Sequence, residues 1–195
     1  MENFKYNDWR DKLGKTLRND KVIVDGSEQN LCTILDNDDK LRGKIRYNSF
    51  TETIQKSDLP WGKNGDWSDY DTAELKCYLE IYRKAGFQRD KILDALLITA
   101  HAHEFHPVRE FLNSLHWDEV ERLGSLLTNH LQAEDTELNR KVSVCFMVKA
   151  VQRIYEPGCD CQFMPVFIGQ QGCGKSSLPR ILAGEWLNDS EIDVG

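Results

Sequence analysis

The chain has 195 residues, of which 40% are hydrophobic and 29% charged, an ordinary composition for one large or two small globular domains. Its formal net charge of -7 argues against a broad nonspecific grip on nucleic acid, although a local basic patch stays open. The first twenty residues lack the apolar core of a signal peptide, and no run approaches the roughly 18 apolar residues of a membrane span. We therefore expect a cytoplasmic protein that does not cross a membrane.

The spacing of the cysteines predicts that their thiols are reduced. None has the paired C-x-x-C spacing of a zinc site, so we expect buried free thiols rather than disulfides or metal ligands. A single C-x-C, Cys159 to Cys161, is too weak a pattern to favour a metal. The six positions are Cys32, Cys77, Cys145, Cys159, Cys161 and Cys173.

The first third of the chain predicts a small mixed region. Apolar residues at helical spacing predict an amphipathic helix over residues 4–18, although Gly14 weakens it. Ser27 is placed to cap a second helix that ends near Leu35. Residues 44–56 alternate partly and predict a β-hairpin around Asn48 and Ser49, followed by a loop over residues 59–69.

From residue 71 onward the pattern is helical. Capping residues and helix breakers predict helices over residues 73–85, 91–103, 108–115, 119–131 and 137–155. The first is capped by Asp71 or Thr72, the third is opened by Pro107, the fourth is capped by Asp118, and the last is capped by Asp135 or Thr136. In the last helix, apolar residues at helical spacing predict a stripe that faces the core: Leu138, Val142, Cys145, Phe146, Val151 and Ile154.

A histidine-rich segment invites comparison with a metal site. It contains His101, His103, Glu104 and His106. On a helix only His103 and His106 share a side, and Pro107 disturbs the backbone there, so capping or packing is the preferred interpretation.

The most specific motif lies between residues 169 and 176. The sequence GQQGCGKS fits G-x-x-x-x-G-K-[ST] at every position, between an apolar run over 163–168 that predicts a strand and a predicted helix over 176–183. The glycines let successive N–H groups point inward to hold phosphate. A glycine-rich turn that binds nothing is the alternative. Pro179 is harmless to the helix in one register and kinks it in the next.

The motif assigns roles to single residues. Lys175 reaches the β and γ phosphates of ATP and is the candidate catalytic residue, and Ser176 completes the coordination of Mg²⁺. Oxidation of Cys173, inside the loop, is expected to block entry of the nucleotide. The candidate nucleotide-binding residues are Gly169, Gln170, Gln171, Gly172, Cys173, Gly174, Lys175, Ser176 and Ser177.

Several stretches in fixed order resemble one family. HPVREFL, HWDEVERL, YEPGCD, MPVFIGQQGCGKSS and GEWLNDS, which lie between residues 106 and 190, resemble the virulence-associated protein E family. The resemblance, which covers roughly residues 71–190, implies a P-loop NTPase of phages, prophages or genomic islands, similar to superfamily 3 replicative helicases. The chain departs from the family at Glu119, where glycine is common, and at Pro179.

The resemblance also implies which parts are missing. In the family the acidic motif that holds magnesium and activates water follows the GEWLNDS stretch. Phosphoryl transfer needs such a residue, so we expect the chain to bind ATP but, with an incomplete catalytic site, to hydrolyse little of it. Carboxylates that remain near the end are interpreted as a solvated acidic turn: Glu185, Asp189, Glu191 and Asp193.

Together these patterns predict an α+β chain that is predominantly helical. Residues 1–68 form an N-terminal region with a hairpin, residues 69–158 a multi-helix region, and residues 159–195 the incomplete start of an α/β P-loop domain. We expect the N-terminal part of a DNA replication ATPase or helicase of a phage or mobile element, in the cytoplasm of a bacterial host. DNA, further copies of the chain and a replication protein are its expected partners.

The alternative function is a non-enzymatic adaptor with a vestigial or assembly-controlling loop. Its helical region, residues 71–155, docks on DNA or a replication protein in this hypothesis. The basic residues proposed to face DNA are Arg89, Lys91, Arg140, Lys141, Lys149 and Arg153, although a solvated helix face is the preferred interpretation of them.

Overall fold

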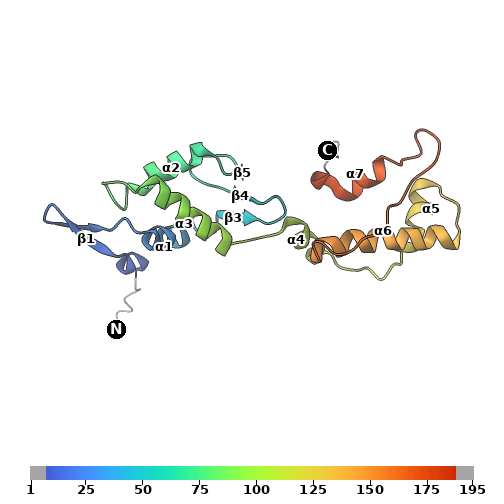
Figure 1. Ribbon diagram of the computed structural model, residues 1–195, viewed down its shortest axis with the longest axis horizontal. Helices are drawn as coiled ribbons and strands as arrows, with labels where there is room; N and C mark the ends of the chain where they lie inside the picture. The colour runs from blue at the N-terminus through green and yellow to red at the C-terminus, as the bar shows by residue number, and fades with distance from the viewer. Residues whose placement is uncertain (1–7, 188–195) are drawn as a thin grey trace. The chain divides into compact units, whose positions relative to one another are not determined.

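The computed structural model describes residues 8–187, which form two compact units, one up to Leu112 and one from Asn113 onward (Figure 1). Helices predominate in the described residues, beside two small antiparallel sheets, so the predicted α+β class is confirmed. Among residues 8–187, no helix has the length and apolar character needed to span a bilayer. Each unit is described by itself.

The first unit contains a β-hairpin where the second half of a helix was predicted. A short 3-10 helix, Trp9–Lys12 (η1), precedes strands β1, Lys15–Arg18, and β2, Lys21–Val24. Asn19 and Asp20 have φ angles of 50° and 56°, and a two-residue turn with both φ positive matches the twist of paired strands. In its described part, the predicted helix over residues 4–18 is limited to the 3-10 turn Trp9–Lys12 and is wrong over residues 15–18, which form a strand; residues 4–7 lie outside the described range.

The base of the hairpin is fixed to helix α1, Glu28–Asn37, by one buried amide. The side chain of Asn30 accepts a hydrogen bond from Gly14 N at 2.8 Å and donates one to Gly14 O at 2.9 Å. Gly14 O also accepts from Asp25 N at 3.0 Å. A Cβ atom at position 14 would lie 2.6 Å from an Asp25 carboxylate oxygen, so any larger residue would have to displace the Asp25 side chain. Ser27 caps α1 as predicted.

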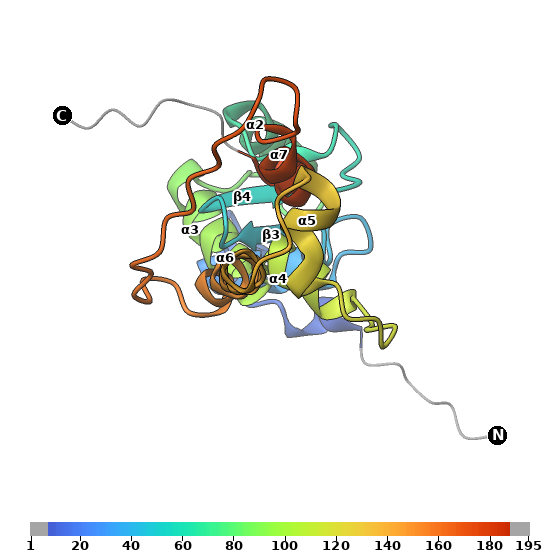
Figure 2. The same cartoon turned by 90° about the vertical axis from the view of Figure 1, so that its right-hand side faces the viewer.

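A second sheet follows, as the sequence predicts for residues 44–56. Strands β3, Ile45–Asn48, and β4, Thr53–Lys56, lie side by side (Figure 2) and pair antiparallel. In this register Ile45 is opposite Lys56. A short third strand, β5, Gly65–Asp66, adds to β4 within the stretch predicted as a loop. Its two residues carry no apolar alternation, and for that reason the pattern did not indicate a strand.

Helices α1 and α3 build the core of the first unit with β3. Helix α3, Arg89–Ala102, agrees with its prediction, whereas α2, Asp69–Leu79, begins and ends earlier than predicted. Burying these apolar side chains is the main source of stability here. The core comprises Leu13, Leu31, Ile34, Leu35, Leu41, Ile45, Leu59, Leu75, Leu79, Phe87, Ile92, Ala95, Leu96 and Ala100.

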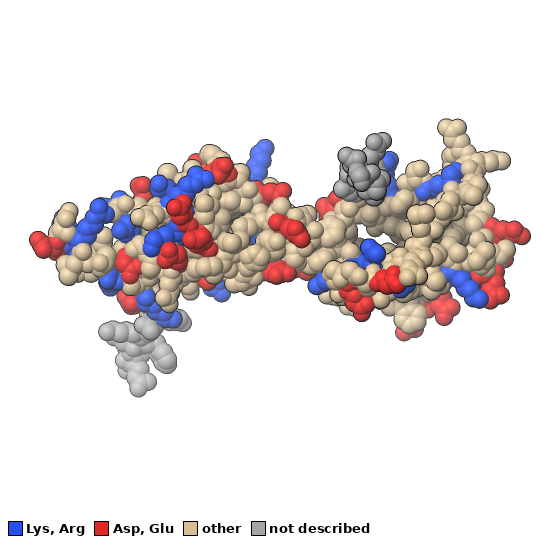
Figure 3. Space-filling model, in the orientation of Figure 1, with Lys and Arg blue, Asp and Glu red and all other residues tan. Residues whose placement is uncertain are grey.

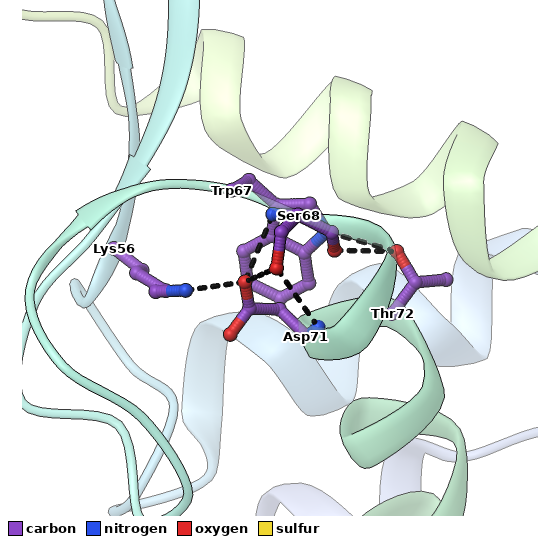
Figure 4. A network of polar contacts seen from close by, with 5 residues as sticks. All are labelled: Lys56, Trp67, Ser68, Asp71 and Thr72. Carbon is purple, nitrogen blue, oxygen red and sulfur yellow. Dashed lines mark hydrogen bonds and ion pairs between the residues drawn. The ribbon is translucent and has the colours of Figure 1, made fainter.

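A buried carboxylate determines where α2 begins. Ser68 is the N-cap, and the Asp71 side chain bonds back to Ser68 N at 2.8 Å, which completes a capping box (Figure 4). Lys56 of β4 pairs with the same Asp71 carboxylate, which is fully buried. Burial alone raises the pKa of Asp71, but the bonds from Lys56 and Ser68 outweigh it and hold the pKa below its ordinary value.

The second unit contains fewer buried apolar residues. Helix α4, Pro107–Ser114, spans the boundary between the units and begins at the predicted proline. A 3-10 turn, Leu123–Ser125 (η2), leads into α5, Leu126–Leu131, and then α6, Glu137–Tyr155, which Thr136 caps as predicted. Ser143 joins the two helices, because its fully buried hydroxyl accepts from Leu127 N at 3.3 Å and donates to Asn139 O at 2.9 Å. Helix α7, Ser177–Ala183, and a 3-10 turn, Gly184–Trp186 (η3), follow.

The helix predicted over residues 119–131 forms only in its last part. Asp118 accepts from Val120 N at 3.2 Å and pairs with Arg122 through two bonds of 2.6 and 2.7 Å. The Arg122 guanidinium lowers the pKa of Asp118 to about 2. Between Asp118 and Val120, Glu119 has a φ of 64°, which is outside the helical range and breaks the helix. Residues other than glycine rarely adopt a positive φ.

The apolar stripe predicted to face the core on α6 is not buried. Ser143 is the one described residue of α6 that is buried, and Leu138 is 69% exposed. A helical spacing of apolar residues shows that a face exists but not that a partner covers it. The prediction of a buried stripe is therefore wrong for the described residues.

We expect Asp71→Asn to destabilise the first unit by about 3–5 kcal/mol, because the substitution leaves the Lys56 charge nearly buried without its partner. Urea unfolding followed by hydrogen exchange on α3 peptides measures this. Glu137→Gln, which breaks the exposed pair of Glu137 with Lys141, is the matched control and should change little.

The same carboxylate gives a pH dependence. Because the pKa of Asp71 is lower in the folded chain, its stabilisation is complete above the unfolded pKa of about 3.9 and is lost as pH falls through the folded value. Asp71→Asn should lack this part of the acid dependence. An unchanged acid profile in the variant would show that Asp71 does not contribute it.

We expect Glu119→Gly to stabilise the second unit by about 1 kcal/mol, since it relieves the cost of a left-handed backbone at a residue with a side chain. Exchange protection of α5 in urea gives the measurement. Glu121→Gly is the control, because Glu121 is not among the residues with positive φ and glycine there should destabilise. Equal effects at the two positions would contradict this explanation.

Candidate phosphate-binding loop

The segment that precedes the loop is extended but is not paired as a strand. Residues 163–168 alternate, with Phe163, Pro165 and Phe167 half-buried and the side chains between them exposed, Ile168 by 93%. Phe167 meets Phe146 of α6 edge-on, with 6.1 Å between ring centroids. No described segment supplies a neighbouring strand for its N–H and C=O groups. The predicted strand is therefore wrong as a strand, although its alternation is present.

Two glycines of residues 169–174 are favoured by their backbone conformation, and the third by a close side chain. Gly172 and Gly174 have φ angles of 88° and 87°, in the region that favours glycine. A side chain on Gly169 would approach Cys173 Sγ to 3.1 Å, closer than a normal contact. The sequence GQQGCG thus forms a tight turn in which positive φ angles favour glycine at 172 and 174 and the nearby Cys173 sulfur favours it at 169.

Lys175 folds back over this turn. Its Nζ donates to the carbonyl oxygens of Gly169 and Gln170, both at 2.7 Å, and lies 3.3 Å from Cys173 Sγ. The ammonium group is therefore held above the loop by oxygen atoms of the loop itself. A carbonyl oxygen carries only a partial charge, so a phosphate oxygen competes well for the same ammonium group.

The remaining candidate residues are accessible. Gln170, Gln171, Ser176 and Ser177 are exposed, and Ser176 is the N-cap residue of α7 without a side-chain capping bond, so its hydroxyl is not used by the helix. Pro179 is the third residue of α7, within the first turn, where an N–H has no partner inside the helix. The proline is thus compatible with the helix in the register that the chain adopts.

The loop borders a cavity of about 650 Å³ within the second unit. Gly169, Cys173 and Lys175 line it on one side, and apolar side chains of α5 and α6, including Leu131 and Val142, line it on the other. This size and mixture suit a small organic ligand with a charged end. Sequence reasoning missed the α5 and α6 side of the cavity, since spacing alone does not show which helix lies beside a loop.

The cysteines and histidines do not form a metal centre in the described residues. Within residues 8–187 no three His, Cys, Asp or Glu side chains gather as a metal would need. The cysteines are free, as predicted, but Cys77 and Cys145 are exposed and the other four half-buried, which corrects the prediction of buried thiols.

Each histidine of the 101–106 segment has a packing or capping role. His101 stacks on Tyr47, with ring centroids 3.9 Å apart, and His103 Nε2 lies 3.1 Å from an Asp36 oxygen. His106 Nδ1 accepts from Arg109 N at 3.3 Å in the first turn of α4. The preferred interpretation of capping or packing therefore agrees with the structure.

Comparison with known families supports the resemblance for the second unit. Residues 112–194 match the model of the virulence-associated protein E-like domain. The match includes the loop, α5 and α6, while residues 71–111, which the resemblance was expected to cover, lie outside it. No curated protein matches the chain.

Of the four carboxylates predicted to form a solvated acidic turn, the structure describes one. Glu185 is exposed in η3, in agreement with a solvated position. Asp189, Glu191 and Asp193 lie outside the described residues.

Proposed function

We propose that the second unit binds the phosphate groups of a nucleotide, with ATP as the expected ligand and Mg²⁺ as the expected ion. The observation that carries this proposal is the position of Lys175 above a glycine turn. Its ammonium group is held at 2.7 Å by two loop carbonyls that a phosphate can replace. The open side of the loop faces a cavity with an apolar wall, which is large enough for the rest of a nucleotide.

The roles of the loop residues follow from their chemistry. Lys175 supplies a point charge to phosphate oxygens, and the exposed Ser176 hydroxyl is suited to a magnesium ion that keeps most of its waters. The glycine positions leave room for phosphate against the backbone of residues 169–174. Magnesium, when bound, neutralises phosphate charge during transfer.

In the larger activity we propose, nucleotide binding serves a DNA replication ATPase or helicase of a phage or other mobile element. The match of residues 112–194 to the virulence-associated protein E-like domain and the G-x-x-x-x-G-K-[ST] motif support this proposal. We expect residues 1–195 alone to hydrolyse ATP slowly, because phosphoryl transfer also needs an acidic residue and a residue that orients the attacking water, and we assign neither among residues 8–187.

The adaptor alternative is weakened by the ion pairs of four of its six basic residues, while Lys149 and Arg153 have none with another described residue. Arg89 is paired with Asp69, Lys91 with Glu28, Arg140 with Asp135 and Lys141 with Glu137. A cation engaged with a carboxylate of its own chain contributes less to binding an outside phosphate.

The test is calorimetric titration of the chain with ATP and Mg²⁺. Lys175→Met, which keeps the apolar stem and removes the charge, should weaken binding at least tenfold. Lys141→Met is the control, because Lys141 lies in the same unit but is paired with Glu137, and it should bind as the original chain does. Equal affinity in the Lys175 variant would refute the proposed role.

Hydrolysis is tested separately by phosphate release. Slow release is expected from the original chain. Rapid release that Lys175→Met abolishes would confirm the loop as the ATP site and contradict the expected lack of turnover.

Cys173 offers an independent test of occupancy. Its sulfur lies 3.3 Å from Lys175 Nζ at the edge of the cavity, so bound ATP should slow alkylation of Cys173 by iodoacetamide severalfold. Peptide mass spectrometry measures the rate, and exposed Cys77 in the first unit is the internal control. Equal slowing at both cysteines, or at neither, would count against a ligand in the loop.

A further inference from the structure

Phosphate contacts alone give the second unit little means to choose between nucleotides. On the face drawn in Figure 3, its Asp and Glu side chains lie among its Lys and Arg side chains, so no broad positive surface is present on that face to attract phosphate. Every nucleoside triphosphate offers the same phosphate groups to Lys175. A choice between bases therefore depends on the side of the cavity that α5 and α6 form.

The end of α5 lies directly against the loop. A Cβ atom added to Gly174 would lie 3.4 Å from Leu131 Cδ2 and 3.8 Å from His130 O. Gln132 ends the helix with a φ of 56°, and the turn that follows lines the same cavity as Lys175. A nucleotide whose phosphates contact Lys175 would thus have its remaining atoms beside this turn and the start of α6.

One amide side chain at the start of α6 has a fixed orientation. Asn139, half-buried in the first turn, donates from Nδ2 to Glu134 O at 2.7 Å, and a reversed amide would place two oxygen atoms against each other there. Glu134 O also accepts from Thr136 N at 2.9 Å, and Thr136 Oγ1 accepts from Asn139 N at 3.2 Å. These bonds hold the turn in place, and they leave Asn139 Oδ1 as an acceptor without a donor among the described residues.

We propose that this side of the cavity holds the base of the nucleotide and that Asn139 selects adenine, because its Oδ1 accepts a hydrogen bond from the 6-amino group. Leu131 and Val142 offer an apolar surface on which a base can lie. Guanine and hypoxanthine carry an oxygen atom at position 6, which would meet Asn139 Oδ1 with no hydrogen between them. The inference rests on the proposed phosphate site at Lys175 and adds a residue that determines which nucleotide binds there.

A neighbouring carboxylate does not favour guanine instead. Glu134 lines the same cavity and has no ion pair with another described residue, and a carboxylate can accept from the two adjacent N–H donors of guanine. Its side chain is exposed, so water competes for the same oxygen atoms and such a contact discriminates weakly. The half-buried amide of Asn139 is less open to this competition.

The experiment is calorimetric titration of residues 1–195, in the presence of Mg²⁺, with ATP, inosine triphosphate, GTP or inorganic tripolyphosphate. ATP should bind at least tenfold more tightly than each of the others, since two of them lack the 6-amino donor and the last lacks a base. This comparison uses the unaltered chain and does not depend on the folding of a variant. The proposal is overturned if inosine triphosphate or GTP binds as tightly as ATP.

A substitution tests the residue itself. Asn139→Leu should lower the affinity for ATP to that for inosine triphosphate and leave the affinity for tripolyphosphate unchanged. Asn129→Leu is the control, because Asn129 is exposed in α5, donates to Ser125 Oγ at 3.1 Å and is not among the residues that line the cavity. Circular dichroism shows whether each variant is folded. A preference for ATP that survives in folded Asn139→Leu, or that the control loses equally, would contradict the assignment.

Tripolyphosphate separates this inference from the function on which it rests. Lys175→Met should weaken the binding of all four ligands, because each of them carries phosphate. If tripolyphosphate binds through Lys175 and ATP binds no more tightly, the phosphate site is correct and the base site is wrong. If none of the four ligands binds, both are wrong.

Discussion

A buried ion pair between Lys56 and Asp71 joins the second sheet of the first unit to the start of α2. A carboxylate without water is costly unless several donors surround it, and here Lys56 and Ser68 supply them. One Asp71 oxygen, Oδ1, has no protein partner among the described residues, so the group depends wholly on the other oxygen. Because Asp71 also closes the capping box, loss of the pair would release β4 and the first turn of α2 together, and with them the surface against which α3 packs.

The sequence predicted the start of a helix correctly where a single residue determines it. Ser27, Pro107 and Thr136 begin helices as predicted, because a cap or a proline acts within one turn. The hairpin at residues 15–24 was missed because Leu13 and Leu17 fit helical spacing, while the decisive signal was the pair Asn19 and Asp20, which tolerate positive φ. The helix break at Glu119 was missed as well, since glutamate does not indicate a left-handed backbone.

The parts of the site that depend on distant segments were not predictable. The motif located the glycines and Lys175, whose positions rest on turn geometry alone. It did not show that α5 and α6 border the loop, nor that residues 163–168 would lack a neighbouring strand among the described residues. Pairing of strands and covering of helix faces require partners far away in the chain, and periodicity carries no information about which partner arrives.

The two units differ in how much apolar surface they bury. Of the buried hydrophobic residues described, all but Leu127 and Leu178 belong to the first unit. The second unit should therefore open in subglobal fluctuations well below the free energy of complete unfolding, so that one free energy does not describe the chain. A ligand in the cavity beside the loop would contact α5, α6 and the glycine turn at once. Its binding free energy would then raise the free energy needed to open the second unit.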